Sequence, residues 1–228
     1  MKIVNYILRL FVGGLFIFSG IVKLIDPKGT QIKLEEYFTS FARLGEHYIS
    51  DFIGSFFEAI VPSALFLSVS LSSLEIVLGI AILLWFRPKL TLWTTFGLLI
   101  FFGLLTGYSS SCNPNNEIGV SCVTDCGCFG DFLKLKPIES FYKDLILLFA
   151  SLPLLFMATK KRIDQELLKN SKLIVLGAIV LSIGFGMMNI INLPIVDFRP
   201  YKPGNNIQEL RTNGEPAKIE YLMSKGGN

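Results

Sequence analysis

Charged residues are scarce in this sequence, and several familiar functional motifs are absent. Asp, Glu, Lys and Arg together make up 17% of the 228 residues, against roughly 25% in an ordinary soluble domain. The sequence has no Walker loop, no dinucleotide-binding glycine pattern and no His-Glu-x-x-His motif. Its lone histidine, His47, excludes a haem held by two histidines. These absences argue against an enzyme built around a soluble cofactor.

Basic residues are also never concentrated in one block. The net charge of +3 comes from Lys and Arg scattered over many short segments. Nucleic-acid binding normally needs a basic patch or stripe. We therefore predict no nucleic-acid partner.

Long apolar runs are what the sequence does contain. Hydrophobic residues make up 51% of the chain, and the mean hydropathy is +0.55. They gather in runs of about 20 residues, the length that a hydrocarbon core of about 30 Å requires. We therefore predict an all-α, polytopic transmembrane bundle of about five spans in contact with the lipid bilayer. The predicted spans cover about residues 4–25, 62–86, 90–108, 138–158 and 173–193.

The segments between the spans differ in character. Residues 26–61 begin with the turn signal Asp26-Pro27-Lys28-Gly29 and mix aromatic with charged residues at helical spacing, which is typical of a helix along the interface. The short link Arg87–Lys89 predicts a tight helical hairpin. The end of the chain is polar and rich in Pro, Gly and Asn. We predict a transmembrane domain over residues 1–195, followed by an external tail or the stub of a truncated domain over 196–228.

Basic loops indicate the orientation, because Lys and Arg near span ends resist translocation. The densest basic links are Arg87–Lys89 and Lys160–Lys172, which places both in the cytoplasm. Alternation then puts the N-terminus inside, and the loop 109–137 and the C-terminal tail outside. We predict a multi-pass protein of the cell (inner) membrane, with its cysteines in the oxidising compartment where disulfides persist.

Cysteine occurs only within the predicted external loop. The loop contains Cys112, Cys122, Cys126 and Cys128. Their spacing, C-x9-C-x3-C-x-C, suits two disulfides, or one structural pair and one exchangeable pair. A disulfide across Gly127 alone would close a small strained ring, and strained disulfides are the more oxidising and labile ones. The spacing also suits a relay, in which thiolate attack moves a disulfide along the loop.

The cysteine spacing leaves two interpretations open. Two ordinary disulfides could staple the loop, or one pair could exchange with a partner protein. A structural zinc site is disfavoured, because C-x-C departs from the usual zinc knuckle and an oxidising compartment disfavours free thiolates. We predict no metal, and four cysteines allow three pairings.

Ionisable residues inside the predicted spans form a second group of candidates: Arg9, Lys23, Glu75 and Asp144. Charges in hydrocarbon usually face the bundle interior and pair there, and they often mark function. Glu75 lies near mid-span, and we expect it to pair with Arg9 or to serve as a proton site. Lys23 lies at a span end and could snorkel, whereas Lys143-Asp144 could orient the cysteine loop. A buried pair that only fixes helix packing is an equal interpretation for each.

Small residues also recur within the spans. Pairs at Gly13-Gly14 and Ser19-Gly20, and the Gly184/Gly186 patch, favour close helix contacts over ligand sites.

Four stretches resemble the DoxX-like membrane proteins, especially their MauE (methylamine utilisation) branch. They are GGLFIFSGIVKLIDP in the first span, the Glu75 span, DCGCFGD at 125–131 and SFYKD at 140–144. The resemblance covers roughly residues 1–195. It implies a four-helix core with one further span, and a part in making or exporting the disulfide-rich small subunit of methylamine dehydrogenase. It does not imply that this chain handles methylamine.

The resemblance also implies site residues. It makes Cys126 and Cys128 the reactive pair, with the loop shaped by Gly127, Phe129, Gly130 and Asp131. Cys112 and Cys122 are further catalytic candidates whose role the resemblance leaves open.

The leading hypothesis is a membrane thiol-disulfide oxidoreductase acting on a periplasmic thiol or disulfide protein. No cofactor is evident, and a quinone acceptor is suggested only by analogy with other membrane oxidoreductases. The competing hypothesis is a non-enzymatic assembly or scaffold protein with structural disulfides. A small-molecule transporter using Glu75 and Arg9 is a weaker alternative, because five spans show no inverted repeat.

Overall fold

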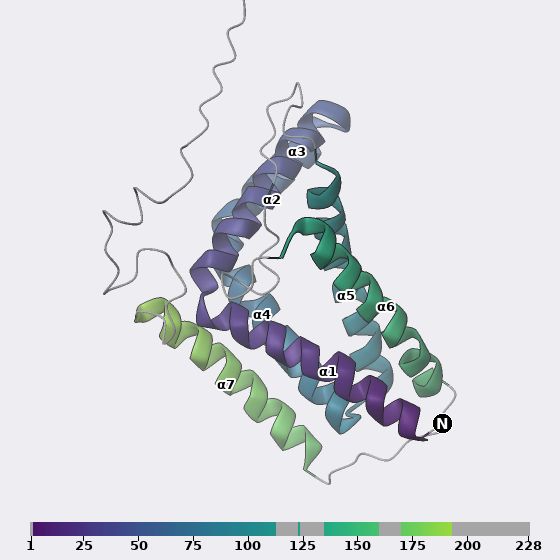
Figure 1. The fold of residues 1–228 in the computed structure, drawn as a ribbon. Helices are drawn as coiled ribbons and strands as arrows, with labels where there is room; N and C mark the ends of the chain where they lie inside the picture. The colour runs from purple at the N-terminus through teal and green to yellow at the C-terminus, as the bar shows by residue number, and fades with distance from the viewer. Residues whose placement is uncertain (1, 113–122, 124–134, 160–169, 193–228) are drawn as a thin grey trace, which may run out of the picture. The chain divides into compact units, whose positions relative to one another are not determined.

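The computed structural model describes residues 2–112, 123, 135–159 and 170–192, which contain helices and no strands (Figure 1). The elements are α1 (Lys2–Ile25), α2 (Pro27–Tyr48), α3 (Asp51–Ile60), the 3-10 helix η1 (Val61–Ser63), α4 (Ala64–Leu84), α5 (Pro88–Ser111), α6 (Pro137–Thr159) and α7 (Ser171–Ile191). The predicted tail, 196–228, lies outside the described residues, so the proposed domain division stays a prediction.

Five helical segments among the described residues are long and apolar enough to cross a membrane. They are Ile3–Ile25, Asp51–Leu84, Pro88–Ser111, Pro137–Ala158 and Ser171–Ile191. The predicted all-α, five-span membrane protein is therefore confirmed. The second segment joins α3, η1 and α4 over 34 residues, or about 51 Å, well beyond the ~30 Å of a hydrocarbon core. Because α4 alone is long enough to cross the hydrocarbon core, α3 is not needed for the crossing.

The predicted turn at Asp26 is a junction of a single residue between two helices. α1 ends at Ile25, and α2 begins with Pro27, whose fixed φ suits the first helical position. Asp26 caps α2, because its Oδ1 accepts a hydrogen bond from the Gly29 N–H at 3.0 Å. The chain therefore changes direction without a loop, and α2 packs against α3 and α4.

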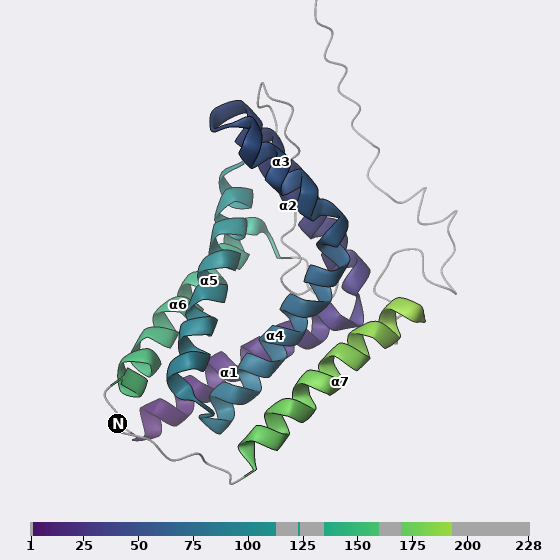
Figure 2. The same cartoon turned by 180° about the vertical axis from the view of Figure 1, so that it is seen from behind.

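Four helices share the main apolar core. Its buried residues are Val12 and Phe16 of α1, Leu78 and Ile82 of α4, the α4 C-cap residue Trp85, Leu92, Leu98 and Leu99 of α5, and Leu147, Leu154 and Ala158 of α6. α7 packs outside this core along α4, where Phe185 and Ile190 contact the cluster of Leu24, Val69 and Ile76 (Figure 2). This arrangement agrees with the four-helix core and one further span that the family resemblance implies.

Small residues bring α1 and α4 into close contact. A Cβ added at Gly79 would lie 2.6 Å from the Gly13 carbonyl oxygen, and one added at Gly20 would lie 2.6 Å from the Ser72 carbonyl oxygen. The predicted close contacts are therefore confirmed for Gly13 and Gly20, as they are for Gly186. Gly14 and Gly184 were predicted wrongly, because no atom of a neighbouring element lies within 4 Å of a Cβ at either position.

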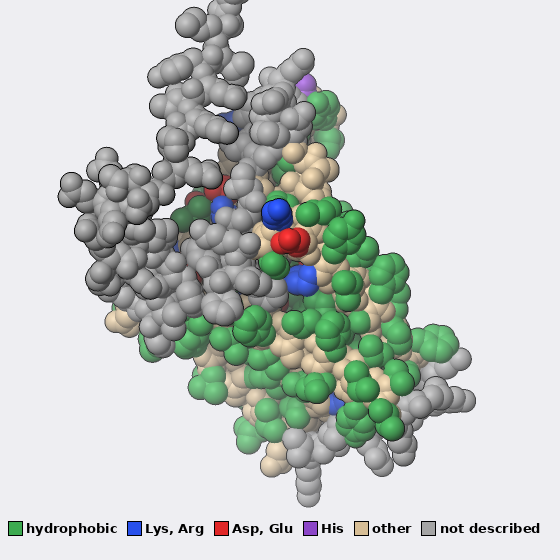
Figure 3. All heavy atoms as spheres, in the orientation of Figure 1, with side chains coloured by type: hydrophobic (Ala, Val, Ile, Leu, Met, Phe, Trp, Pro, Cys, Tyr) green, Lys and Arg blue, Asp and Glu red, His purple; other side chains and the backbone are tan. Residues whose placement is uncertain are grey.

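Large apolar side chains cover the outward faces of the described helices (Figure 3). Phe66 of α4, Trp93 of α5, Phe149 of α6 and Leu181 of α7 are all exposed. Contiguous apolar surface on this scale would promote association in water, whereas lipid tails solvate it. The surface therefore agrees with a membrane-embedded bundle.

Candidate functional site

A buried ion pair joins α1 to α4. Lys23 Nζ lies 2.5 Å from Glu75 Oε1, and the two residues are 5% and 3% exposed. α1 and α4 run antiparallel and approach closely at Gly20 and Ser72, so Lys23 and Glu75 lie one helical turn to either side of this contact, and their side chains meet across it. Lys23 Nζ also lies 4.2 Å from the centroid of the Phe102 ring, a cation–π contact with α5. The expectation that Lys23 snorkels is wrong, because its ammonium group points into the bundle.

Arg9 does not pair with Glu75, contrary to one of the two expectations. Its Nε donates to the Ile82 carbonyl at 2.9 Å, and its Nη2 donates to the Leu83 carbonyl. Both carbonyls belong to the last turn of α4, where backbone acceptors lack the usual helical partner, and the Ile82 carbonyl also accepts a hydrogen bond from the Trp85 N–H at 3.2 Å. The guanidinium also lies 4.9 Å from the centroid of the Trp85 ring. Arg9 therefore acts as a C-terminal cap on α4.

Asp144 joins α6 to α5. Its Oδ2 accepts a hydrogen bond from Thr106 Oγ1 at 3.2 Å, and its Oδ1 lies 3.0 Å from Lys143 Nζ. Asp144 is 3% exposed, whereas the Lys143 side chain is 20% exposed. A carboxylate buried to this degree needs such partners.

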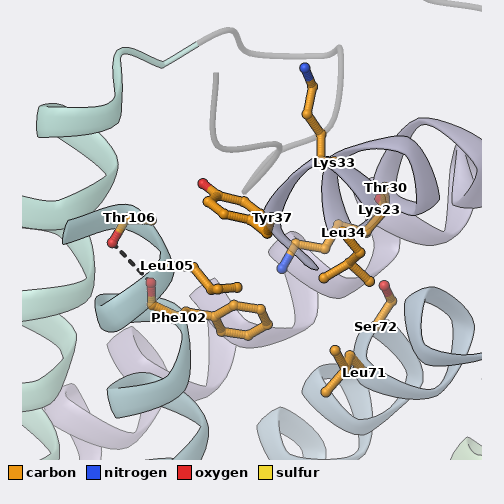
Figure 4. A pocket seen from close by; sticks show the side chains of 10 residues that line it. All are labelled: Lys23, Thr30, Lys33, Leu34, Tyr37, Leu71, Ser72, Phe102, Leu105 and Thr106. Atoms are coloured by element: carbon orange, nitrogen blue, oxygen red, sulfur yellow. Dashed lines mark hydrogen bonds between the residues drawn. The ribbon is translucent and has the colours of Figure 1, made fainter. Parts of the chain in front are cut away.

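Two small cavities flank the Lys23 ammonium group. The first, of about 20 Å³, lies between the two ion pairs, and its polar wall consists of Ser19, Lys23, Glu75, Lys143 and Asp144. The second, of about 30 Å³, shares Lys23 and Phe102 with the first, and Tyr37, Leu105 and Thr106 also line it. Figure 4 shows these side chains reaching it from three helices, with Lys33 pointing away. Each cavity has room for one or two water molecules.

Val123, a described residue of the cysteine loop, contacts side chains that line the second cavity. Val123 is 2% exposed and packs against Tyr37 and Leu105. Its carbonyl oxygen accepts a hydrogen bond from Ser109 Oγ. The loop is therefore attached, between Cys122 and Cys126, to residues that also line the polar interior.

Cys112 directly follows α5 as its C-cap residue, and it is disulfide-bonded. Its sulfur lies 3.9 Å from Tyr108 Oη, and the Tyr108 ring packs edge-on against Phe41 at 5.0 Å. The other predicted loop residues lie outside the described part of the chain, so their roles stay predictions. They are Cys122, Cys126, Gly127, Cys128, Phe129, Gly130 and Asp131.

Comparison with known families agrees with this arrangement. The model of the family described as methylamine utilisation protein MauE matches residues 1–157. The chain belongs to the MauE family. The match spans α1 to α5 and nearly all of α6, and it contains both ion pairs and the cysteine loop. The predicted MauE resemblance is confirmed. No curated protein and no solved structure matches the chain.

Thr106 and Phe102 are site residues of this MauE-family protein that sequence reasoning missed. Thr106 ends an apolar run in α5, and Phe102 precedes it by one helical turn. A hydroxyl in a span is a usable signal, since such groups often bond across helices. Phe102 carries no signal of this kind, because it is one of many phenylalanines in the spans.

Proposed function

We propose that this MauE-family protein carries out thiol-disulfide exchange on the extracytoplasmic side of the inner membrane. The observation that carries the proposal is the disulfide-bonded Cys112, held at the end of α5 in the segment that contains every cysteine of the chain. Disulfides persist in oxidising compartments. The partner would be a periplasmic protein with a thiol or a disulfide.

The proposed exchange assigns the reactive pair to Cys126 and Cys128. A thiolate of the partner attacks one sulfur of the loop disulfide, forming a mixed disulfide and releasing the other sulfur as a thiolate that takes up a proton. The partner's second thiolate then attacks the mixed disulfide. The partner dithiol is oxidised to a disulfide, and the loop disulfide is reduced to a dithiol. Cys112 and Cys122 would pass the disulfide along the loop, and a membrane quinone, suggested by analogy, would reoxidise the dithiol.

A scaffold is the second candidate, and a specific observation favours it. The chain is fixed on both sides of Cys122, by the disulfide at Cys112 and by the buried Val123. Such attachment also suits a loop whose disulfides only hold a binding surface in shape. The two candidates differ in how easily the disulfides are reduced.

Stepped thiol alkylation of the purified full chain, read by mass spectrometry across a series of redox buffers, tests the proposal. Exchange predicts that a pair containing Cys126 or Cys128 titrates above about −230 mV, the range of catalytic disulfides. A chain in which every pair stays oxidised to below about −300 mV is a scaffold, and the exchange proposal fails.

A matched set of variants adds a second readout, the oxidation of a small dithiol probe by stoichiometric protein. Cys126→Ser with Cys128→Ser is expected to abolish probe oxidation. Ser110→Ala removes an exposed hydroxyl near the C-terminal end of α5, and we expect it to leave probe oxidation unchanged. Equal oxidation by the double serine variant and the unmodified chain contradicts the assignment of the pair.

A further inference from the structure

The interior of the bundle contains a carboxylate oxygen without a bonding partner. Glu75 Oε1 accepts a hydrogen bond from Lys23, but Oε2 has no partner among the described residues. Glu75 is 3% exposed, so bulk solvent does not solvate this oxygen. Burying an unsatisfied charged acceptor is strongly unfavourable. The oxygen therefore indicates a bound hydrogen-bond donor.

The cavity that Glu75 lines limits the size of that donor. Its volume is about 20 Å³, enough for one or two water molecules and too small for a ring compound. Ser19, Lys143 and Asp144 supply further polar groups, whereas Phe16, Leu99 and Leu147 are apolar. A water molecule needs two to four polar partners, and this wall provides them.

With Glu75 ionised, the four charged groups that line the cavity are balanced, two cations against two carboxylates. Lys23 faces it from α1, and Lys143 and Asp144 face it from α6 across the cavity. α5 contributes Leu99 and Phe102, and Lys33 of α2 lines only the second cavity, beyond Lys23. Both Asp144 oxygens already have protein partners. Glu75 Oε2 is therefore the atom best placed to take a proton.

We propose that this cavity is a water-binding, proton-exchanging site that joins the Lys23–Glu75 and Lys143–Asp144 pairs into one cluster. A bound water donates a hydrogen bond to Glu75 Oε2, and a proton passes along that bond to the carboxylate. The water regains a proton from its neighbour, so that no bond other than O–H changes. Lys23 stays positively charged, so protonation of Glu75 leaves the cluster with a net charge of +1, and the Asp144 carboxylate, shared with Lys143, lies across the cavity. The site does not depend on the sulfur chemistry proposed above.

Protons reach this site from the end of the bundle that carries the cysteine loop. Lys23 lies in the last turn of α1, and Thr106 lies near the end of α5, so polar groups line that half of the interior. Toward Arg9 the interior is filled by the apolar core that contains Phe16, Leu78 and Ile82. Exchange is therefore one-sided.

Infrared difference spectroscopy of the purified full chain, stepped through pH in H₂O and in D₂O, tests the site. We expect a protonated carboxylic acid band that appears on acidification and shifts in D₂O, because bound water connects it to solvent. Glu75→Gln is expected to abolish this band. Glu58→Gln, the same change at an exposed carboxylate of α3, is expected to retain it.

A second variant keeps the test decisive if Glu75→Gln does not fold. Asp144→Asn retains an acceptor for Thr106 but removes the charge across the cavity, so the pH midpoint of the Glu75 band is expected to shift. Two results overturn the proposal: a Glu75 that stays ionised over the whole pH range in which circular dichroism shows a folded chain, or a Glu75 band that is unmoved both by D₂O and by Asp144→Asn.

Discussion

Lys23 and Glu75 illustrate how a charge is accommodated inside a bilayer. Each would be strongly unfavourable alone in hydrocarbon, and together they form a 2.5 Å contact next to the Phe102 ring. We therefore expect that removing one partner lowers the free energy of unfolding by more than the intact pair contributes to it. That distinction can be measured.

Lys23→Met is expected to destabilise the fold by about 3–5 kcal/mol, because it leaves the Glu75 carboxylate buried without its cation. The double variant Lys23→Met with Glu75→Leu removes both charges at similar volume, and we expect it to be more stable than Lys23→Met alone. Thermal unfolding followed by circular dichroism in one detergent gives the comparison.

Lys33→Met is the control for this series, because Lys33 pairs with Glu36 at 3.2 Å where the Glu36 side chain is 39% exposed. Its expected effect is about 0–1 kcal/mol. If Lys23→Met unfolds no more easily than Lys33→Met, the buried pair contributes little and the description of its role is wrong.

The sequence identifies Glu75 as a buried group but does not predict its partner. Arg9 and Lys23 are both cations of α1, separated by about four turns. Which of them meets Glu75 depends on the register of α1 against α4. That register is set by the contacts at Gly13, Gly20 and Gly79, and a single sequence shows these glycines without showing which ones face each other.

At the scale of elements, the spans could be predicted because length and hydropathy alone determine them. The helices α2 and α3 could be predicted only as an interfacial segment. Their packing depends on Tyr37 and Phe38, which are buried against residues far along the chain. A helix with mixed polarity does not show by itself which of its aromatic side chains will find such partners.

The contact between α1 and α4 leads to a prediction at this scale. Gly79→Ala is expected to destabilise the bundle by about 1–3 kcal/mol, because the new Cβ would lie 2.6 Å from the Gly13 carbonyl oxygen and force the helices apart. Gly97→Ala on α5 is the matched control. Its Cβ would meet no other described residue outside its own helix backbone within 4 Å, so we expect a neutral change or a gain of up to about 1 kcal/mol. The melting temperatures of the two variants, measured in the same detergent, test this prediction. An equal decrease in both would contradict the close contact between α1 and α4.

At the scale of the whole molecule, the family match and the helix packing divide the chain in the same way. The match ends at residue 157, within α6, and the four helices of the main core all lie inside it or nearly so. α7 follows the match and packs outside that core, on α4. The core that encloses the polar cluster is therefore the part shared with the MauE family.

The role of the loop between the core helices α5 and α6 is the part of the molecule that sequence and structure together define least. Its cysteine spacing predicts redox chemistry or a staple, and the described residues add only the disulfide at Cys112 and the contacts of Val123. Sulfur pairing is set by the folded loop rather than by spacing. The reactive pair is thus a prediction for the alkylation experiment to decide.

The orientation of the bundle can be tested on the full chain with a short split-fluorescent-protein tag. The basic links Arg87–Lys89 and Lys160–Lys172 predict that a tag inserted after Gln165 meets a complementing fragment in the cytoplasm, whereas a tag after Asn228 meets one only in the periplasm. Replacing the five basic residues of 87–89 and 160–162 by Gln removes the charge that holds these links inside, so the fluorescence is expected to become mixed. The reverse pattern in the unmodified chain would place the cysteine loop in the cytoplasm. Because disulfides are rare there, that result would also remove the basis for extracytoplasmic exchange.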